Sequence, residues 1–105
     1  MRLYFLAEKE IIMDCVEKFI QRRWSNTDAH WTDGNCYWFA HILITRFPYL
    51  HLYYLPIIGH FLAGDGVNFY DATGKLQLKE KGILFTDLLH DDPAWGARLL
   101  RDCRD

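Results

Sequence analysis

The spacing of apolar residues predicts a helix near the start of the chain. From about residue 7 to residue 23, apolar side chains recur at helical intervals on one face and charged side chains fill the other. The apolar face contains Ile12, Cys15, Val16, Phe19 and Ile20. We therefore expect an amphipathic helix in which Cys15 is a small core residue.

A second helix is predicted from Cys36 to Phe47, with Thr32 or Asp33 as its N-cap. Pro48 ends it, because proline lacks a backbone N–H and clashes with the preceding turn. The segment is apolar on almost every side. This pattern favours a buried central helix over a surface helix.

In the next segments, apolar residues either alternate with polar residues or follow one another, as is typical of strands. Residues 49–55 predict a strand buried on both faces, and residues 59–71 predict a β-hairpin. We take Asp65-Gly66 as a two-residue type I′ turn, because both of its central residues need positive φ. Counting outward from that turn places His60 directly opposite Asp71 on one face. A slip of one residue would put these two side chains on opposite faces.

The patterned segments in the C-terminal third of the chain are shorter. Residues 76–78 alternate like a strand, and residues 83–89 fit either a helical turn or a strand end. Asp91-Asp92-Pro93 indicates a helix start, with proline at the first helical position. Two helices, several antiparallel strands and a small terminal helix predict an α+β fold. The length of 105 residues predicts one domain, residues 1–105.

Charge and cysteine content narrow the class of protein. The net charge is −2 without a basic block, which disfavours a nucleic-acid binder. No apolar run is long enough for a membrane span, and the N-terminus lacks the apolar core of a signal peptide. Three cysteines are an odd number, so we expect free thiols and a cytoplasmic location.

Cys36 is the candidate nucleophile. A thiol in the first turn of a helix lies at the positive end of the helix dipole, which favours the thiolate. The unpaired N–H groups there can stabilise a developing oxyanion, and either Asp33 or Asn35 could supply a further donor. His60 beside Asp71 would complete the arrangement of nucleophile, base and orienting carboxylate. The catalytic residues that we predict are therefore Cys36, His60 and Asp71.

Two other interpretations of these residues carry less weight. Cys36 could simply be the first core residue of a buried helix, but the helix start, the His60–Asp71 pair and the chain order together favour the triad. A metal site built from His30, Cys36, His41 and His60 is weaker, because no pair has the short spacing of a zinc motif. His41 and His51 are expected to be core histidines. We therefore expect neither a metal nor a cofactor.

The segments around these residues resemble the papain-like superfamily of cysteine enzymes. Residues 34–40 (Gly-Asn-Cys-Tyr-Trp-Phe-Ala) are similar to its cysteine helix, and His60-Phe61 and residues 70–74 (Tyr-Asp-Ala-Thr-Gly) to its histidine and aspartate strands. Transglutaminase-like proteins and bacterial double-glycine leader peptidases fit about equally. The resemblance implies a papain-like helix packed on an antiparallel sheet. It also implies Cys36 as nucleophile, His60 as general base and acid, and Asp71 as the orienting group.

The function implied by this resemblance is thiol-dependent acyl transfer. The enzyme would be a cysteine peptidase, an amidase or a transglutaminase-like protein acting on a peptide or protein amide through a thioester. Two parts of the chain depart from the family pattern: His30-Trp31 occupy the region where a glutamine is usual, and Leu62 stands where transglutaminase-like proteins have tryptophan. The alternative is a catalytically inactive papain-like fold that serves as a protein-binding module or inhibitor.

Overall fold

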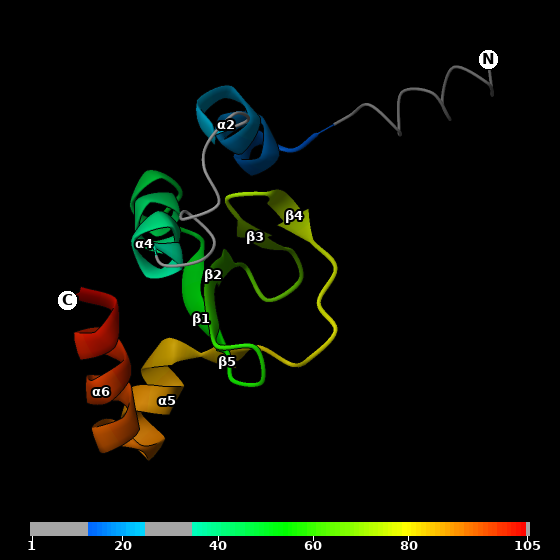
Figure 1. Ribbon diagram of the computed structural model, residues 1–105. Helices are drawn as coiled ribbons and strands as arrows, with labels where there is room; N and C mark the ends of the chain where they lie inside the picture. The colour runs from blue at the N-terminus through cyan, green and yellow to red at the C-terminus, as the bar shows by residue number, and fades with distance from the viewer. Residues whose placement is uncertain (1–12, 25–34, 105) are drawn as a thin grey trace, which may run out of the picture.

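The computed structural model describes residues 13–24 and 35–104. Within these residues the helices are α2 (Cys15–Trp24), α4 (Cys36–Arg46), α5 (Phe85–Asp91) and α6 (Pro93–Arg104). The strands are β1 (His51–Leu55), β2 (His60–Gly64), β3 (Phe69–Asp71), β4 (Gly74–Leu76) and β5 (Ile83–Leu84). This arrangement confirms the α+β fold class (Figure 1).

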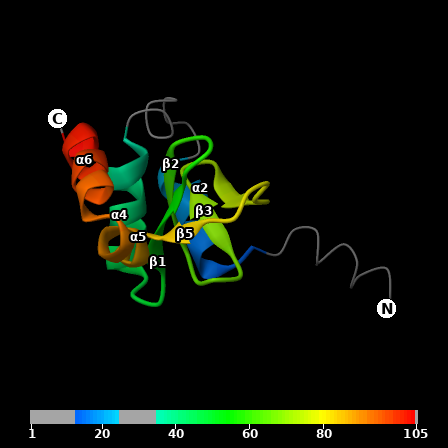
Figure 2. The ribbon, with the colours of Figure 1, turned by 90° about the horizontal axis from the view of Figure 1, so that it is seen from below.

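The five strands form one antiparallel sheet in the order β4-β3-β2-β1-β5. β2 is the central strand, and α4 packs mainly against it. α2 lies near the β4 edge, while α5 packs at the β1–β5 edge with α6 beside it (Figures 1 and 2). The strand that begins with His60 is therefore next to the helix that begins with Cys36.

A reciprocal pair of hydrogen bonds fixes the start of α2. The backbone N–H of Asp14 donates to Glu17 Oε1 at 3.1 Å, and the N–H of Glu17 donates to Asp14 Oδ1 at 2.8 Å. This is a capping box, which satisfies two N–H groups that have no helical partner. The predicted helix residues up to 12 lie outside the described part of the chain. Cys15 is exposed, so its assignment to the core was wrong: Val16 and Ile20 form the buried face instead.

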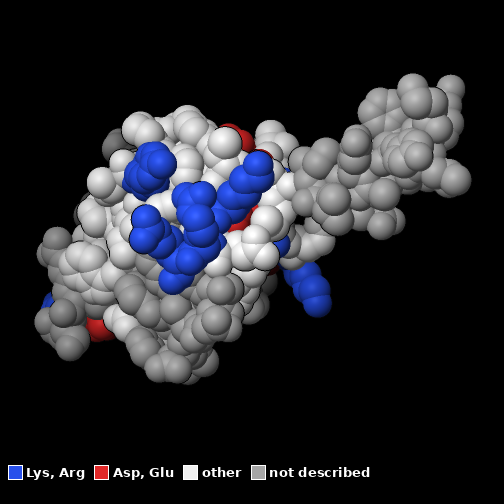
Figure 3. Space-filling view, turned by 90° about the horizontal axis from the view of Figure 1, so that it is seen from above, with Lys and Arg blue, Asp and Glu red and all other residues white. Residues whose placement is uncertain are grey.

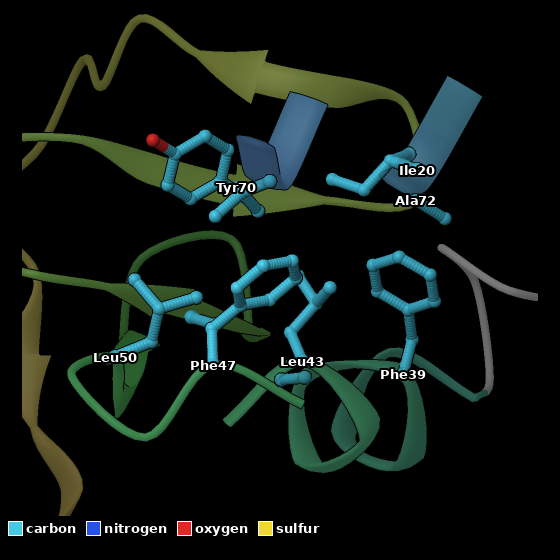
Figure 4. Packing of buried hydrophobic residues seen from close by; sticks show 10 residues of the cluster. Ile20, Phe39, Leu43, Phe47, Leu50, Tyr70 and Ala72 are labelled. Carbon is cyan, nitrogen blue, oxygen red and sulfur yellow. The ribbon is translucent and has the colours of Figure 1, made fainter. Parts of the chain in front are cut away.

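One hydrophobic cluster joins α2, α4 and β3. Ile20 of α2 and Phe39 and Leu43 of α4 point toward Tyr70 and Ala72 (Figure 4). The aromatic and aliphatic side chains of this cluster are almost wholly removed from water, which is the main source of stabilisation for such a fold. Its members are Val16, Ile20, Phe39, Ala40, Leu43, Phe47, Leu50, Ala63, Tyr70 and Ala72.

A second, aromatic cluster joins α4 and β2 to α5. Phe61 is at its centre: its ring lies 5.2 Å from that of Tyr37, 5.2 Å from that of Phe85 and 4.8 Å from that of Tyr54. The contacts with Tyr37 and Phe85 are edge-to-face, a specific geometry that restricts the position of the ring. The backbone directly after His60 is thus held from three sides, and Cys36 packs against the same cluster.

The predicted buried central helix, α4, packs on the central strand but is buried on one face only. Trp38 and Ile42 are 40% and 37% exposed, whereas Ala40 and Leu43 are buried, because the sheet packs against one face of the helix. Together with Phe19 of α2, this outer face lines a groove of ≈ 480 Å³. His41 also lies on this face and His51 is exposed at the start of β1, so neither is a core histidine.

Basic side chains lie on α2 and at the rim of this groove. Lys18, Arg22 and Arg23 are exposed on α2, and Figure 3 shows Lys and Arg side chains grouped on that face. The guanidinium of Arg46 lies 5.7 Å from the ring centre of Phe19 and 5.0 Å from that of Phe47. Cation–π contacts of this kind attach a charge to the rim of an apolar surface.

The C-terminal elements agree partly with the sequence pattern. The strand expected at residues 76–78 is β4 at Gly74–Leu76, and the undecided segment 83–89 contains both a strand, β5, and most of a helix, α5. Pro93 is the first residue of α6, and Asp92 Oδ1 accepts the backbone N–H of Trp95 at 3.2 Å. Across the described residues, no helix has the length and apolar content needed to cross a membrane.

Candidate active site

Cys36 is half-buried and is the first residue of α4. Asn35 is the N-cap, but its side chain makes no capping hydrogen bond. The predicted caps Thr32 and Asp33 lie outside the described residues. The backbone N–H of Tyr37 donates to the Cys36 sulfur, so the helix start directs a donor at the thiol. Since the N-terminal N–H groups carry the positive end of the helix dipole, this position stabilises negative charge on sulfur.

The β2–β3 connection differs from the predicted two-residue turn. Gly64 pairs with Phe69, so the loop contains the four residues 65–68. Asp65 Oδ1 accepts the N–H groups of Val67 at 2.9 Å and Asn68 at 2.7 Å, and the Asp65 N–H donates to the Asn68 carbonyl at 3.1 Å. The prediction was wrong because an aspartate side chain can hydrogen-bond the backbone two residues on and so stabilise a longer loop.

The longer loop changes which residue faces Asp71. Ala63 pairs with Tyr70, and the same register places Leu62 opposite Asp71, so the predicted direct opposition of His60 and Asp71 was wrong. The register differs by two residues, and side chains two apart in a strand share a face. His60 and Asp71 are therefore diagonal neighbours, and His60 Nε2 lies 2.9 Å from Asp71 Oδ2.

Thr73 fixes the carboxylate of Asp71. Its backbone N–H and its hydroxyl donate to Asp71 Oδ1 at 2.8 Å and 2.5 Å, which leaves Oδ2 for His60. Burial would raise the pKa of Asp71, but the hydrogen bonds from His60 and Thr73 outweigh it and hold the pKa below its ordinary value. Sequence reasoning did not assign Thr73 to the site. The Asp-x-Thr spacing, which suits a local side-chain turn, is the signal that could have indicated it.

His60 and Cys36 also affect each other's titration, because a hydrogen bond between the ring and the thiol is among the causes of both pKa shifts. Because Nε2 is bonded to Asp71, Nδ1 is the nitrogen that remains for the thiol. The bond to Asp71 and then the bond to Cys36 raise the pKa of His60 to about 9, against the effect of burial. These contacts therefore favour the protonated imidazole.

The pKa of the Cys36 thiol shifts in the opposite direction to that of His60. Burial would raise its pKa, but hydrogen bonds from His60 and from the backbone N–H groups of Phe61 and Tyr37 hold the pKa below its ordinary value of 9.0. The lowered thiol pKa and the raised imidazole pKa favour the same state. Both shifts therefore favour the thiolate of Cys36 and the imidazolium of His60.

The structure thus brings together Cys36 from α4, His60 from β2 and Asp71 from β3. Of the residues considered as metal ligands, Cys36 and His60 come together and His41 lies apart, in the groove beside α4, while His30 is outside the described residues. Within the described part of the chain, no group of three or more His, Cys, Asp or Glu side chains is suited to hold a metal ion.

A comparison with known proteins finds a match over the region that contains this site. A family model for the phage YunG-like protein matches residues 10–92. The chain belongs to the phage YunG-like family. No curated protein and no solved structure matches it. The YunG-like match contains Cys36, His60 and Asp71, while α6 lies beyond it.

The YunG-like match also corrects the resemblance drawn from the sequence. The matching family is not a papain-like one, nor a transglutaminase-like or leader-peptidase branch of that superfamily. The resemblance rested on short motifs around a helix start and two strands. Motifs of this length recur on unrelated folds, because the same local chemistry can be built on many scaffolds.

Proposed function

We propose that this YunG-like protein is a thiol enzyme that transfers an acyl group from a peptide or protein amide through a thioester at Cys36. The observation that carries the proposal is the arrangement of Cys36, His60 and Asp71, in which His60 Nε2 lies 2.9 Å from Asp71 Oδ2 and the pKa of Cys36 is lowered by a hydrogen bond with His60. Acyl transfer needs a nucleophile, a proton carrier and a group that orients the carrier. These three residues supply the three roles.

In the first step, the Cys36 thiolate attacks the carbonyl carbon of the amide and a C–S bond forms. The oxyanion develops near the start of α4, where backbone N–H groups can stabilise it. The C–N bond then breaks as the His60 imidazolium gives its Nδ1 proton to the departing nitrogen. The products are a thioester on Cys36, a free amine and a neutral imidazole.

In the second step, water or an amine attacks the thioester. The neutral imidazole of His60 accepts the proton of the attacking group, the C–S bond breaks, and the thiolate–imidazolium pair is restored. Water gives hydrolysis and an amine gives transamidation. Asp71 keeps the ring of His60 in place through both steps and transfers no proton.

The proposed chemistry needs a reduced sulfur, so we place the protein in the cytoplasm. Cys15 and Cys36 are both free thiols, which supports this part of the proposal. Their different surroundings also provide an internal comparison, since Cys15 is exposed and Cys36 is half-buried. Accessibility alone would make Cys15 the faster of the two to react.

The test compares the reactivity of Cys15 and Cys36 and then looks for the acyl intermediate. At pH 6 to 7, iodoacetamide should modify Cys36 faster than Cys15. The His60→Ala substitution should lower the rate of modification of Cys36 and leave the rate at Cys15 unchanged. With p-nitrophenyl acetate, mass spectrometry should find one acetyl group on Cys36 that hydroxylamine removes, and Cys36→Ser should lack it. Faster labelling of Cys15 together with no acetyl adduct would contradict the proposal and favour a binding module on the same fold.

A further inference from the structure

The loop between β1 and β2 presents two large apolar side chains to solvent. Ile57 and Ile58 are 82% and 66% exposed, and His60 follows two residues later. A single exposed isoleucine is ordinary on a protein surface, but adjacent exposed apolar residues often mark a binding surface. Both isoleucines also lie directly before a residue of the candidate active site.

Glu80 fixes the backbone of this loop. Its Oε1 accepts the N–H of Ile57 at 3.0 Å and its Oε2 accepts the N–H of Ile58 at 3.2 Å. The N–H of Gly59 donates to the carbonyl of Leu55 at 2.8 Å, and Gly59 has φ +69°, which glycine adopts at little cost. The loop is therefore ordered by contacts to its backbone, while both isoleucine side chains extend away from the protein.

The same loop leads straight into the reactive pair. The first residue of β2, His60, hydrogen-bonds to the Cys36 sulfur, and the second, Phe61, directs its backbone N–H at that sulfur. Figure 2 shows the β1–β2 loop at the end of the sheet where α4 begins. The loop that carries Ile57 and Ile58 therefore lies at the same end of the sheet as Cys36 and leads directly to His60.

We infer that Ile57 and Ile58 bind an apolar side chain of the acyl donor, next to the carbonyl that Cys36 attacks. The inference rests on the proposed function and names its substrate class: peptides with an aliphatic or aromatic residue at the bond that is cleaved or transferred. A loop ordered before binding loses little conformational freedom when a ligand docks on it. This is why the tether to Glu80 matters as much as the two side chains.

The chain offers a matched control for these side chains. Val67 is also 82% exposed, but it lies in the β2–β3 loop at the opposite end of β2. Removing its side chain takes away a comparable apolar surface at a distance from Cys36. A general effect of surface hydrophobicity would appear in Val67→Ala, and a subsite would not.

The experiment measures the rate at which Cys36 is acylated, by mass spectrometry of the full chain. The donors are p-nitrophenyl esters of acetate, N-acetyl-leucine and N-acetyl-aspartate. The unaltered protein should prefer the leucine ester to the aspartate ester. Ile57→Ala/Ile58→Ala should lower the leucine rate about 10-fold, with the acetate rate and the iodoacetamide rate unchanged, and Val67→Ala should change none of them.

Glu80→Ala tests the tether separately. It should raise the ester concentration needed for half-maximal acylation by the leucine ester, with little change in the maximal rate, because the subsite is present but no longer ordered. The inference is overturned if the double isoleucine variant keeps the leucine rate, or if all donors slow equally. Failure of the proposed function would look different: no donor would acylate Cys36 in any variant.

Discussion

Asp71 reaches His60 diagonally across the β2–β3 hairpin, with 2.9 Å between Asp71 Oδ2 and His60 Nε2. The residue directly opposite Asp71 in the register is Leu62, which is fully buried. Thr73 holds the other carboxylate oxygen, so Asp71 is fixed on both sides. Each contact in this chain has a measurable consequence for the titration of Cys36 or for the stability of the fold.

The pH dependence of acylation should have two limits. The acid limit reflects formation of the Cys36 thiolate, whose pKa is lowered from 9.0 by the hydrogen bond from His60, against burial. The alkaline limit reflects loss of the imidazolium proton, because the pKa of His60 is raised to about 9. We expect acylation by an amide donor to fall above pH 9 while iodoacetamide labelling, which needs no proton donor, does not. A common alkaline decline in both reactions would contradict this assignment.

Asp71→Asn should lower the pKa of His60 toward 6.5 and move the alkaline limit of acylation down with it. It should also change stability in a pH-dependent manner. Folding raises the pKa of His60, so the stabilisation by its protonated form is complete below pH 6.5 and is lost as the pH rises through about 9. In urea unfolding, the gap between the protein and Asp71→Asn should be larger at pH 6 than at pH 9.5. An equal gap would mean that Asp71 acts only through packing.

Thr73→Val should test whether the threonine hydroxyl positions Asp71. The substitution removes one donor to Asp71 Oδ1 and keeps both the side-chain shape and the backbone N–H donor. We expect a loss of about 1 kcal/mol in the free energy of unfolding and a rise in the pKa of Asp71. Thr73→Ser retains a hydroxyl, so it should keep most of the stability and most of the lowering of the Asp71 pKa. A serine variant no better than the valine variant would assign the role of Thr73 to packing alone.

Gly64→Ala should destabilise the fold, because a Cβ at this position would overlap the ring of Phe69 across the hairpin. Overpacking of a buried site usually costs about 1–3 kcal/mol in the free energy of unfolding. Gly82→Ala is the control: its added Cβ would meet Tyr53 at an ordinary 3.5 Å. Thermal or urea unfolding should separate the two variants clearly. Equal effects would mean that Phe69 moves aside without cost.

The hairpin illustrates what local sequence signals can and cannot predict. Asp65-Gly66 correctly indicated a reversal of the chain, because the pair tolerates the needed backbone angles. It did not determine the loop length, because the Asp65 side chain competes with the strands for the N–H groups of Val67 and Asn68. His60 and Asp71 still share a face, since the error in register was two residues.

Features that depend on distant parts of the chain were harder to anticipate. An apolar helix such as α4 predicts burial, but how much of it is covered depends on how many layers the rest of the chain builds around it. Trp38 and Ile42 remain exposed for this reason. The tether from Glu80 to Ile57 spans 23 residues and leaves no local pattern in the sequence. Tertiary contacts of this kind appear only once the fold is known.

The four-residue β2–β3 loop has a consequence for how this family can change during evolution. Residues added or removed between Gly64 and Phe69 leave the pairing of the two strands, and with it the shared face of His60 and Asp71, unchanged. Divergent members that keep both residues should therefore vary freely in the length of this loop. A single residue inserted within the paired strands would instead turn one of the two side chains away, unless a β-bulge absorbs it.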